Sequence, residues 1–553
     1  MTHRFFRRGW PAPRISRLPA AAAAALTVLA LPALASAATA KTYHPTRTDD
    51  PAPNGCKKKD CSLREAVIAA NDAGGGRIVL RPGKRYVLTR KGAGENAGLT
   101  GDLDASLGVE PFDVNLGIEI RTKGQRGPMA TIDANGIDRV FDGSPTLDRL
   151  ILRGGHARAL PGEKGDGGAV RGFPTVIDSR FLKNTADGRG GAIYFSRGPS
   201  AITRTTLKGN KAAGDGGAVY FLQACNGPEG HFDFTRSRAT HNSAGGNGGA
   251  ILSYCALELR RSKIDENSAK GAGGGIFSPG STIPPEATTP DPSEWRSSAF
   301  LWQSTLAGNR ARSLGGGLAL NSGSGGTIAL STVSGNSAGS SGGGIGINAP
   351  SAGPAVSVQV EVSTLANNKA GRDAGGIGTA DAAVGFGSHA TVSLNHVTIA
   401  RNQANTALES GAQRAGLGGG IYEEDNDVFT VRNTIVALNT VATFHKPQAS
   451  DCATPFGNPI TSLGHNLIGN PAGCTGFGAV GDLFGGKLRL GKLGKNGGPT
   501  KTIALQKGSR AIGHADNTIP TMSGAIDQRG FKWDKAPDIG AYDRGAKPPR
   551  TRH

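Results

Sequence analysis

The strings Phe181-Leu182-Lys183-Asn184 and Gly190-Gly191-Ala192-Ile193 hold a pattern that returns along the middle of the chain and decides the fold. In each copy, Gly follows the Asn after seven residues and an aliphatic residue follows it after nine. The Asn positions are Asn184, Asn210, Asn242, Asn267, Asn309, Asn336 and Asn368. The pattern is fixed within each copy, whereas the distance between copies varies. This is typical of a solenoid whose loops differ in length.

Short β-rich runs flank the copies, such as Ala201–Leu207 before Asn210 and Ala192–Phe195 after Gly191. They alternate with a period of two, and no helical period appears in the repeats. The repeats therefore predict an all-β fold, a right-handed parallel β-helix with coils about 4.8 Å apart. Glycines at the turns supply positive φ and let neighbouring coils approach closely.

The Asn column is predicted to be structural. Stacked Asn side chains can hydrogen-bond to one another and to the turn backbone, which would form a ladder. A row of ligand-binding groups is the alternative. Asp187, Asp215 and Asp373 decorate some turns and suggest calcium, but the nine-residue repeat of calcium-binding β-rolls is absent. Solvated turn carboxylates are therefore favoured.

Composition and charge exclude several classes of protein. Glycine accounts for 86 of the 553 residues, which argues against a mostly helical chain, and no Gly-X-Y period indicates collagen. The net charge of +19 falls to about +10 when residues 1–40 and 544–553 are set aside. Such a surface favours contact with anionic polymers. No stripe of Lys and Arg interleaved with aromatic residues occurs, so nucleic-acid binding is not expected.

Residues 1–40 have the pattern of a signal peptide, with a basic start, the apolar run Ala20–Ala35 and small residues at the cleavage site. An uncleaved membrane anchor is the alternative, although the run is short and contains Pro32. Arg7-Arg8 leaves the general and the twin-arginine export routes open. The sequence shows no later segment that could span a membrane, so a secreted or cell-surface protein is predicted.

The six cysteines fit an oxidising compartment. They fall into three local pairs, Cys56/Cys61, Cys225/Cys255 and Cys452/Cys474. Nearest-neighbour disulfides are predicted, out of fifteen connectivities. The cysteine and histidine spacing does not match a metal site, so no metal or other cofactor is expected.

One helix is predicted, within Cys61–Asn71 near the N-terminal end of the solenoid. Ser62 and Glu65 form a capping box, and Gly74 follows the helix as a C-terminal cap. This element can cover the core and strand edges that an open β-helix exposes. A β-rich C-terminal cap is the expected counterpart.

Literal strings carry three family resemblances. Cys61-Ser62-Leu63-Arg64-Glu65-Ala66 resembles the CSLREA domain, an N-terminal module of secreted and surface bacterial β-helix proteins. The opening pattern around Asn184 resembles the polymorphic outer membrane protein repeat. Leu463–Gly469, Asn496–Thr500 and Asp527-Gln528-Arg529-Gly530 resemble a choice-of-anchor Q domain, which precedes surface anchors in its family. Together they imply a secreted or surface β-helix of the pectin-lyase-like fold.

The predicted organisation has five parts. A signal peptide over 1–40 precedes a CSLREA-like cap over 41–90. The β-helix repeats occupy 91–440, a choice-of-anchor Q-like region occupies 441–543, and a basic tail occupies 544–553.

No catalytic constellation is identified, and no catalytic, cofactor-binding or metal-binding residue is assigned. A glycosidase needs two suitably spaced carboxylates, which a β-helix would place on neighbouring coils. The best acidic cluster on the repeats is Glu423-Glu424-Asp425, for which a solvated edge is favoured over catalysis or cation binding. The histidines form no pair or triad with Ser and Asp.

A binding surface has more support. The position ten residues after each Asn is predicted to point outward, and it holds Tyr194, Tyr220, Leu252 and Phe277 in the first copies. Tyr194, Tyr220 and Phe277 are candidates for stacking on sugar rings. Ordinary aromatic pairing on stacked strands is the alternative. The Pro-rich insertion Pro279–Trp295 is a candidate cover for this column.

These observations predict a monomeric, non-catalytic protein that binds a polysaccharide or another envelope polymer. A polysaccharide lyase or glycoside hydrolase of the pectin-lyase-like fold is the first alternative. A structural surface spacer is the second.

Overall fold

The computed structural model describes residues 41–549 apart from 93, 96, 106–116, 197–199, 223–229, 285–295, 351–352, 380–388, 408–416, 425, 456–457 and 519–520. The predicted signal peptide, 1–40, and the last four residues of the basic tail lie outside the described residues. The chain from Lys41 onward forms one compact unit. Within the described residues, no helix is both long and apolar enough to cross a bilayer.

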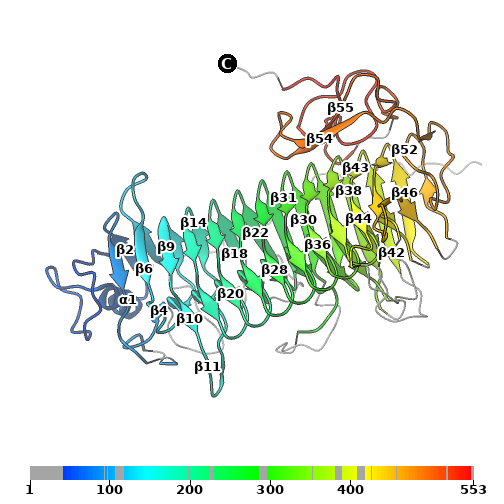
Figure 1. The fold of residues 1–553 in the computed structure, drawn as a ribbon. Helices are drawn as coiled ribbons and strands as arrows, with labels where there is room; N and C mark the ends of the chain where they lie inside the picture. Colours follow the sequence, from blue (N-terminus) through cyan, green and yellow to red (C-terminus); the bar gives the residue numbers. More distant parts are fainter. Residues whose placement is uncertain are drawn as a thin grey trace, which may run out of the picture. The chain divides into compact units, whose positions relative to one another are not determined.

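Parallel strands form four walls around a common core (Figure 1). A representative coil has β17 (Ile193–Phe195) in the first wall and β18 (Ser200–Thr203) in the second. The same coil has β19 (Thr206–Lys208) in the third wall and β20 (Lys211–Ala212) in the fourth. The fold is a right-handed parallel β-helix, as predicted.

The walls extend over most of the described chain. The first runs from β4 (Leu103–Ala105) to β50 (Cys452–Ala453), and the second from β1 (Thr42–Tyr43) to β51 (Thr461–Ser462). The third runs from β3 (Arg85–Val87) to β53 (Leu483–Phe484), and the fourth from β10 (His156–Ala157) to β49 (Gln448–Ala449). The coils therefore continue beyond residue 440.

The aliphatic residue nine positions after each Asn points into the core, as predicted. The fully buried members of this column are Ile193, Val219, Ile251, Ile276, Leu318, Ile345 and Ile377. Gly is required in the preceding turn, where Gly190 has a φ of +65°. A Cβ atom on Gly191 would lie 2.3 Å from the carbonyl oxygen of Gly217 in the next coil, so the coils can stack only around a glycine.

The predicted Asn ladder is confirmed. Nδ2 of each Asn donates to Oδ1 of the next Asn at 2.9–3.0 Å, and the backbone N–H donates to the same oxygen at 2.9–3.1 Å. Asn402 and Asn439 continue the predicted set, and all of these side chains are buried. The column therefore satisfies buried polar groups and leaves no open row for a ligand.

Asp451 ends the ladder, and its chemistry suits that place because a carboxylate only accepts hydrogen bonds. Its Oδ1 accepts from the backbone and side-chain amides of Asn439, and its Oδ2 accepts from the backbone of Asn470. Burial raises the pKa of Asp451 to about 6, although these hydrogen bonds lower it. An Asn here would instead point its Nδ2 donor at the backbone N–H donor of Asn470.

A second, unpredicted ladder lies at the corner between the second and third walls. The backbone N–H of each corner residue donates to the hydroxyl of its equivalent in the next coil, at 3.0–3.1 Å. Its members are Ser179, Thr205, Ser237, Ser262, Ser304, Ser331 and Ser363. Each stands five positions before a ladder Asn, and that recurring hydroxyl is the sequence signal that could have revealed it.

Helix α1 (Leu63–Asp72) packs at the N-terminal end of the core, and its buried face includes Leu63, Ala66, Val67 and Ala70. The capping box is confirmed. The Ser62 hydroxyl accepts from the backbone of Glu65, and the Glu65 carboxylate accepts from the backbone of Ser62. Gly74 follows the helix with a φ of +69°, as its predicted role in the C-terminal cap requires.

Arg64 anchors this helix to the first coils. Its side chain is 0% exposed and pairs with Asp50, which is 2% exposed, at 2.7 Å between Nε and Oδ1. The terminal nitrogens donate to the carbonyl oxygens of Gly98, Gly101 and Asp102. A buried guanidinium therefore joins the helix to the segment that leads into β4.

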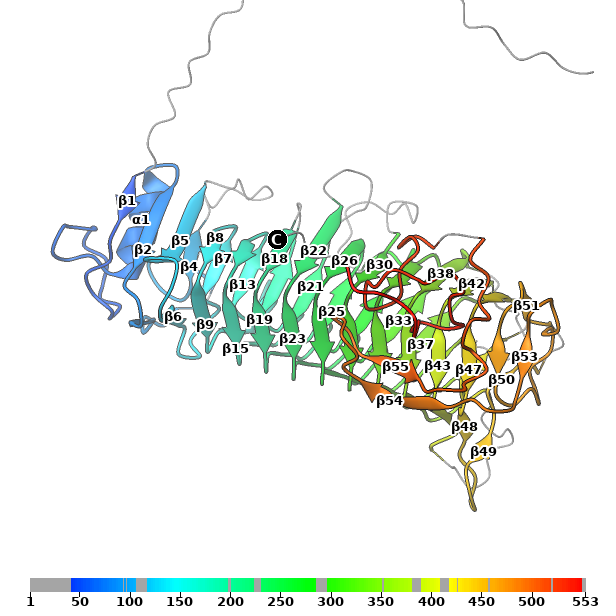
Figure 2. The same cartoon turned by 90° about the horizontal axis from the view of Figure 1, so that it is seen from above.

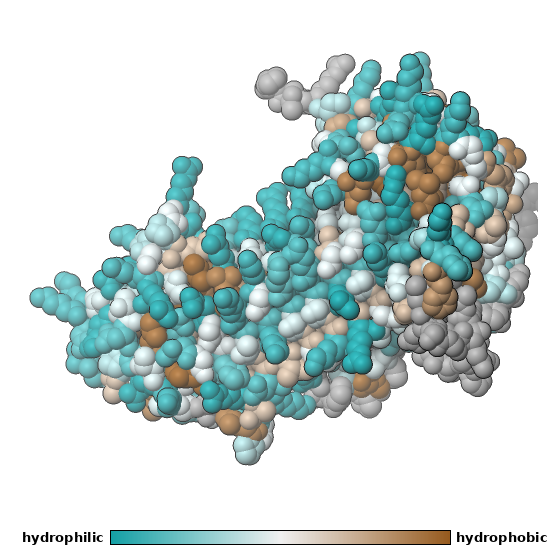
Figure 3. Space-filling view, in the orientation of Figure 1, coloured by the Kyte–Doolittle hydropathy of each residue, from teal (hydrophilic) through white to brown (hydrophobic). Residues whose placement is uncertain are grey.

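Residues 486–549 pack against the outer face of the third wall (Figures 1 and 2). The region contains an antiparallel pair, β54 (Leu490–Gly494) and β55 (Thr502–Leu505). Apolar side chains of this region, including Leu490, Ile503 and Leu505, pack with Ala366, Ala400 and Ala437 of the wall. On the face seen in Figure 3, hydrophilic side chains cover most of the coils and apolar ones gather toward the C-terminal region.

Gln528 supplies a polar part of this contact. The fully buried side chain accepts from the hydroxyl of Thr364 at 2.6 Å and donates to the hydroxyl of Thr332 at 2.9 Å. It also donates to the hydroxyl of Thr500 within its own region. One amide thus joins two successive coils to the region that covers them.

Two predicted disulfides are present, Cys56–Cys61 and Cys452–Cys474. Cys255 is buried and disulfide-bonded. Its predicted partner, Cys225, lies outside the described residues, so that pairing stays a prediction.

Candidate functional site

The aromatic column of the first wall is buried, and the expectation of an exposed sugar-stacking surface is wrong. Tyr194 is 8% exposed and Tyr220 is 1% exposed, with their rings stacked at a centroid distance of 5.3 Å. The Arg189 guanidinium lies over both rings, at 5.2 and 4.7 Å from their centroids. Phe277 is partly buried against the same cluster.

Two neighbouring segments cover this column. Tyr254 packs edge-on against Tyr220, and Ile283 from the Pro-rich insertion packs against the cluster. The described start of that insertion thus acts as the predicted cover, whereas 285–295 lie outside the described residues. These strand positions were predicted to be exposed because they point outward, but loops cover this face of the sheet and bury them.

Glu423 follows β45 (Ile421–Tyr422). The prediction that it lies on a solvated edge is wrong. The residue is 1% exposed, and neither carboxylate oxygen has a hydrogen-bond partner among the described residues. Burial and the charge of Asp427 raise the pKa of Glu423 to about 8. Of the remaining predicted cluster, Glu424 is half-buried and Asp425 lies outside the described residues.

The burial of Glu423 predicts a loss of stability at high pH that Glu423→Gln reduces. The folded-state pKa is raised from 4.5 to about 8, so the protonated carboxyl imposes no penalty below pH 4.5. As the pH rises to about 8, the unfolded chain ionises first and the folded protein loses about 5 kcal/mol. Urea unfolding at pH 4 and pH 9 should show this loss in the parent protein and a smaller one in Glu423→Gln. Equal losses would contradict the assignment.

A second charged cluster, which was not predicted, lies near the N-terminal end of the first wall. Asp104 of β4 and Asp142 of β7 (Phe141–Gly143) are paired in register. Arg139 lies between Asp102 and Asp142, at 3.1 and 3.4 Å from their carboxylates. Arg171 of β13 (Val170–Gly172) also forms an ion pair with Asp142.

This cluster has one property of a catalytic site but lacks an open face. Burial raises the pKa of Asp104 to about 7, which would suit acid–base chemistry. However, Asp104 is only 5% exposed, and its carboxylate accepts a hydrogen bond from the backbone of Gly98 at 2.6 Å. The ion pairs therefore join successive coils at the N-terminal end of the first wall. Among the described residues, no three His, Cys, Asp or Glu side chains meet in a metal-binding arrangement.

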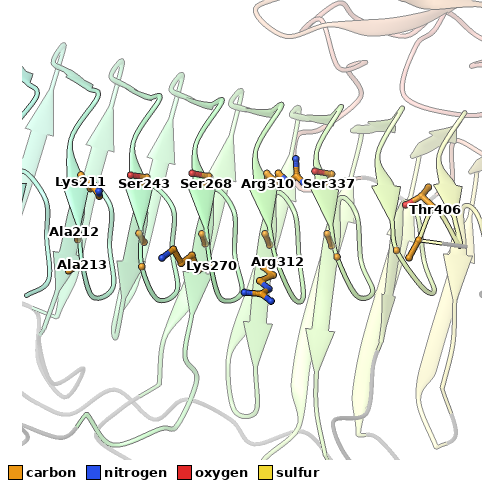
Figure 4. A pocket seen from close by; sticks show the side chains of 18 residues that line it. Lys211, Ala212, Ala213, Ser243, Ser268, Lys270, Arg310, Arg312, Ser337 and Thr406 are labelled. Carbon is orange, nitrogen blue, oxygen red and sulfur yellow. The ribbon is translucent and has the colours of Figure 1, made fainter. Parts of the chain in front are cut away.

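A long groove of about 800 Å³ follows the fourth wall (Figure 4). It crosses β20, β24 (Ser243–Ala244), β28 (Ser268–Ala269), β32 (Arg310–Ala311) and β36 (Ser337–Ala338), which pair in parallel and in register. Thr406 and Ala407 line its far end. The groove therefore has the length and direction of a chain lying along the solenoid axis.

Three consecutive positions after each ladder Asn build the groove. The first position holds Lys211, Ser243, Ser268, Arg310 and Ser337, and the second holds Ala212, Ala244, Ala269, Ala311 and Ala338. The third holds Ala213, Gly245, Lys270, Arg312 and Gly339. Small residues in the groove have a structural reason, because a Cβ atom on Gly245 would lie 1.9 Å from the carbonyl oxygen of Ala213. The Ala that recurs two residues after each Asn is the sequence signal that could have located the groove.

All of the described charged residues that line the groove are cations. Lys211, Lys270, Arg310 and Arg312 line it, and none of its described lining residues is Asp or Glu. Within the described part of the chain, these four side chains form no ion pair or hydrogen bond. The arrangement concentrates positive potential over a floor of small residues, which favours an anionic ligand.

Two coils match a known repeat. Residues 178–196 and 204–222 match the Chlamydia polymorphic membrane protein repeat, in agreement with the predicted resemblance. Comparison with curated proteins gives no match. The matched segments include ladder residue Asn184 and the Gly190–Gly191 turn, and of the four groove cations they contain Lys211.

Two solved structures resemble the chain at low similarity. The A-module of mannuronan C-5 epimerase AlgE6 from Azotobacter vinelandii has a TM-score of 0.37 and 13% identity, over 80% of this chain and 95% of that one. Pectate lyase Pel9A has a TM-score of 0.27 and 13% identity, over 91% of this chain and 96% of that one. Similarities this low do not carry a functional argument.

Proposed function

We propose that this protein is an extracellular, non-catalytic binding protein that holds an extended anionic polysaccharide in the groove of the fourth wall. The observation that carries the proposal is a set of four cations along one continuous groove that pair with no described residue of the chain. Sugar carboxylates or sulfates would supply the counter-charges that the described lining residues lack.

The spacing of the cations suits a chain and not a compact ligand. Lys211 and Arg310 occupy the same column three coils apart, which is about 14 Å at the usual strand spacing. Lys270 and Arg312 stand in the neighbouring column of the same groove. The Ala and Gly floor between these columns lets a polymer backbone lie close to the coils.

Three further observations support an extracellular surface location. Disulfides at Cys56–Cys61 and Cys452–Cys474 favour an oxidising compartment. The polymorphic membrane protein repeat matches two coils. The CSLREA-like and choice-of-anchor Q-like strings agree with this location, and we propose that the cap and the C-terminal region are domains of those kinds.

The groove predicts binding that depends on its own cations. Lys211→Ala/Arg310→Ala should weaken binding to polygalacturonate about tenfold, because two exposed charge contacts contribute up to about 1 kcal/mol each. Affinity electrophoresis or calorimetry can measure the change. Higher salt should weaken the parent complex, and neutral dextran should not bind.

The matched control is Lys208→Ala, an exposed lysine of β19 on the outer face of the third wall. This variant should bind as the parent does. Retention of full affinity by the groove variant would contradict the proposed site. Equal affinity for a single-stranded DNA of similar charge would contradict a preference for polysaccharide.

A further inference from the structure

A row of arginines lies at the corner between the second and third walls. Arg204, Arg236 and Arg261 occupy the same corner of three successive coils, with φ values of 48°, 50° and 51°. The backbone N–H of Arg204 donates to Thr235, and that of Arg236 donates to Arg260, so the corners stack directly. Three arginine positions are thus stacked at the backbone spacing of adjacent coils.

A small hollow of about 260 Å³ lies at this corner. The corner arginines line it together with Arg260, the threonines Thr203 and Thr235, and Trp302. Its volume is below that of a typical site for a drug-sized ligand, so a ligand of about one sugar ring is the appropriate size. The hollow shares no residue with the groove of the fourth wall.

Trp302 gives the hollow a flat aromatic wall. It belongs to β30 (Ser298–Trp302) and pairs in register with Arg260 of β26 (Ala256–Arg260). Its ring stacks with that of Phe300 at a centroid distance of 6.3 Å and an interplanar angle of 8°. The side chain is partly exposed and lines the hollow, and the stacking on Phe300 restricts the orientation of the indole.

The positive charge of the hollow is only partly neutralised. Arg204 is bound to Asp178 through two contacts of 2.7 and 2.8 Å, and Arg260 is paired with Glu258. Arg261 donates to the neutral amide oxygen of Gln303 at 2.9 Å. The Arg236 guanidinium forms no hydrogen bond or ion pair within the described part of the chain. Arg236 and Arg261 therefore have no counter-charge among the residues that the structure describes.

We propose that this corner hollow binds a single anionic sugar unit. The sugar ring stacks on Trp302, and its carboxylate accepts hydrogen bonds from Arg236 and Arg261, whose planar guanidinium groups match carboxylate geometry. The hydroxyl groups of Thr203 and Thr235 hydrogen-bond to the ring hydroxyls. This site adds a terminal or branch-point contact to the protein, separate from a chain in the groove.

Glucuronate binding tests the site by saturation-transfer NMR on the full chain. The parent protein should bind glucuronate, and neutral glucose should bind at least about tenfold more weakly because it lacks the charge. Arg236→Gln should weaken glucuronate binding by about tenfold, and Trp302→Ala by about fivefold. Arg180→Gln is the matched control, because Arg180 is an exposed arginine elsewhere on the third wall.

Each other outcome overturns the proposal. No glucuronate binding by the parent protein, or unchanged binding in Arg236→Gln, would exclude the corner. Inorganic phosphate that binds as tightly as glucuronate, with no effect of Trp302→Ala on glucuronate, would show an anion site without sugar recognition. The Lys211→Ala/Arg310→Ala groove variant should keep its glucuronate binding, which distinguishes failure of this site from failure of the proposed groove.

Discussion

Replacing Arg64 with Met is expected to lower the free energy of unfolding by about 3–5 kcal/mol, because the change leaves a buried carboxylate without its partner. Asp50 is 2% exposed and receives two guanidinium contacts, at 2.7 and 3.1 Å. The carbonyl oxygens of Gly98, Gly101 and Asp102 lose their donor at the same time. Urea unfolding and hydrogen exchange in α1 measure the effect, which should be greatest at the N-terminal coils.

Two variants separate the buried charge from the loss of a side chain. Arg64→Met/Asp50→Leu removes both charges and should recover part of the stability, because no unpaired carboxylate remains. Arg47→Gln removes an arginine that pairs with Asp49 near the surface, and it should leave the unfolding midpoint unchanged. If Arg64→Met were as mild as Arg47→Gln, the anchoring role of the buried ion pair would be wrong.

Replacing Asn309 with Leu in the middle of the ladder is expected to lower the free energy of unfolding by about 4 kcal/mol. Oδ1 of Asn309 accepts from the backbone and side-chain amides of Asn267, at 3.1 and 2.9 Å. Its Nδ2 donates to the carbonyl oxygen of Ile264 and to Oδ1 of Asn336, both at 2.9 Å. Leucine leaves these buried groups unpaired, and differential scanning calorimetry can measure the loss.

Asn309→Asp tests the direction of the ladder. A carboxylate still accepts from Asn267, but it has no donor for Asn336, so this variant should be destabilised at pH 7. It should recover stability at low pH, where the carboxyl can donate. Asn517→Leu, at an exposed position outside the ladder, is the control. Similar effects of Asn309→Leu and Asn517→Leu would contradict a cooperative ladder.

The repeat predicts local structure well because the same environment returns in every coil. The inward aliphatic column, the Asn ladder and the glycine turn each occupy a constant position relative to one another. The capping box of α1 is equally local, since Ser62 and Glu65 stand one helical turn apart. The hydroxyl ladder and the recurring groove alanine use the same periodicity, and both could have been read from positions five before and two after each Asn.

The sequence by itself therefore determined the coil, its core and the polar ladder that joins successive coils. Only the tertiary structure decided which side chains are accessible. It buried Tyr194 and Tyr220 beneath Arg189, Tyr254 and the insertion, and it left the groove cations open. The physical reason is that stacking obeys a period, whereas exposure depends on loops of unequal length and on pairings between coils that are 25–42 residues apart in the chain.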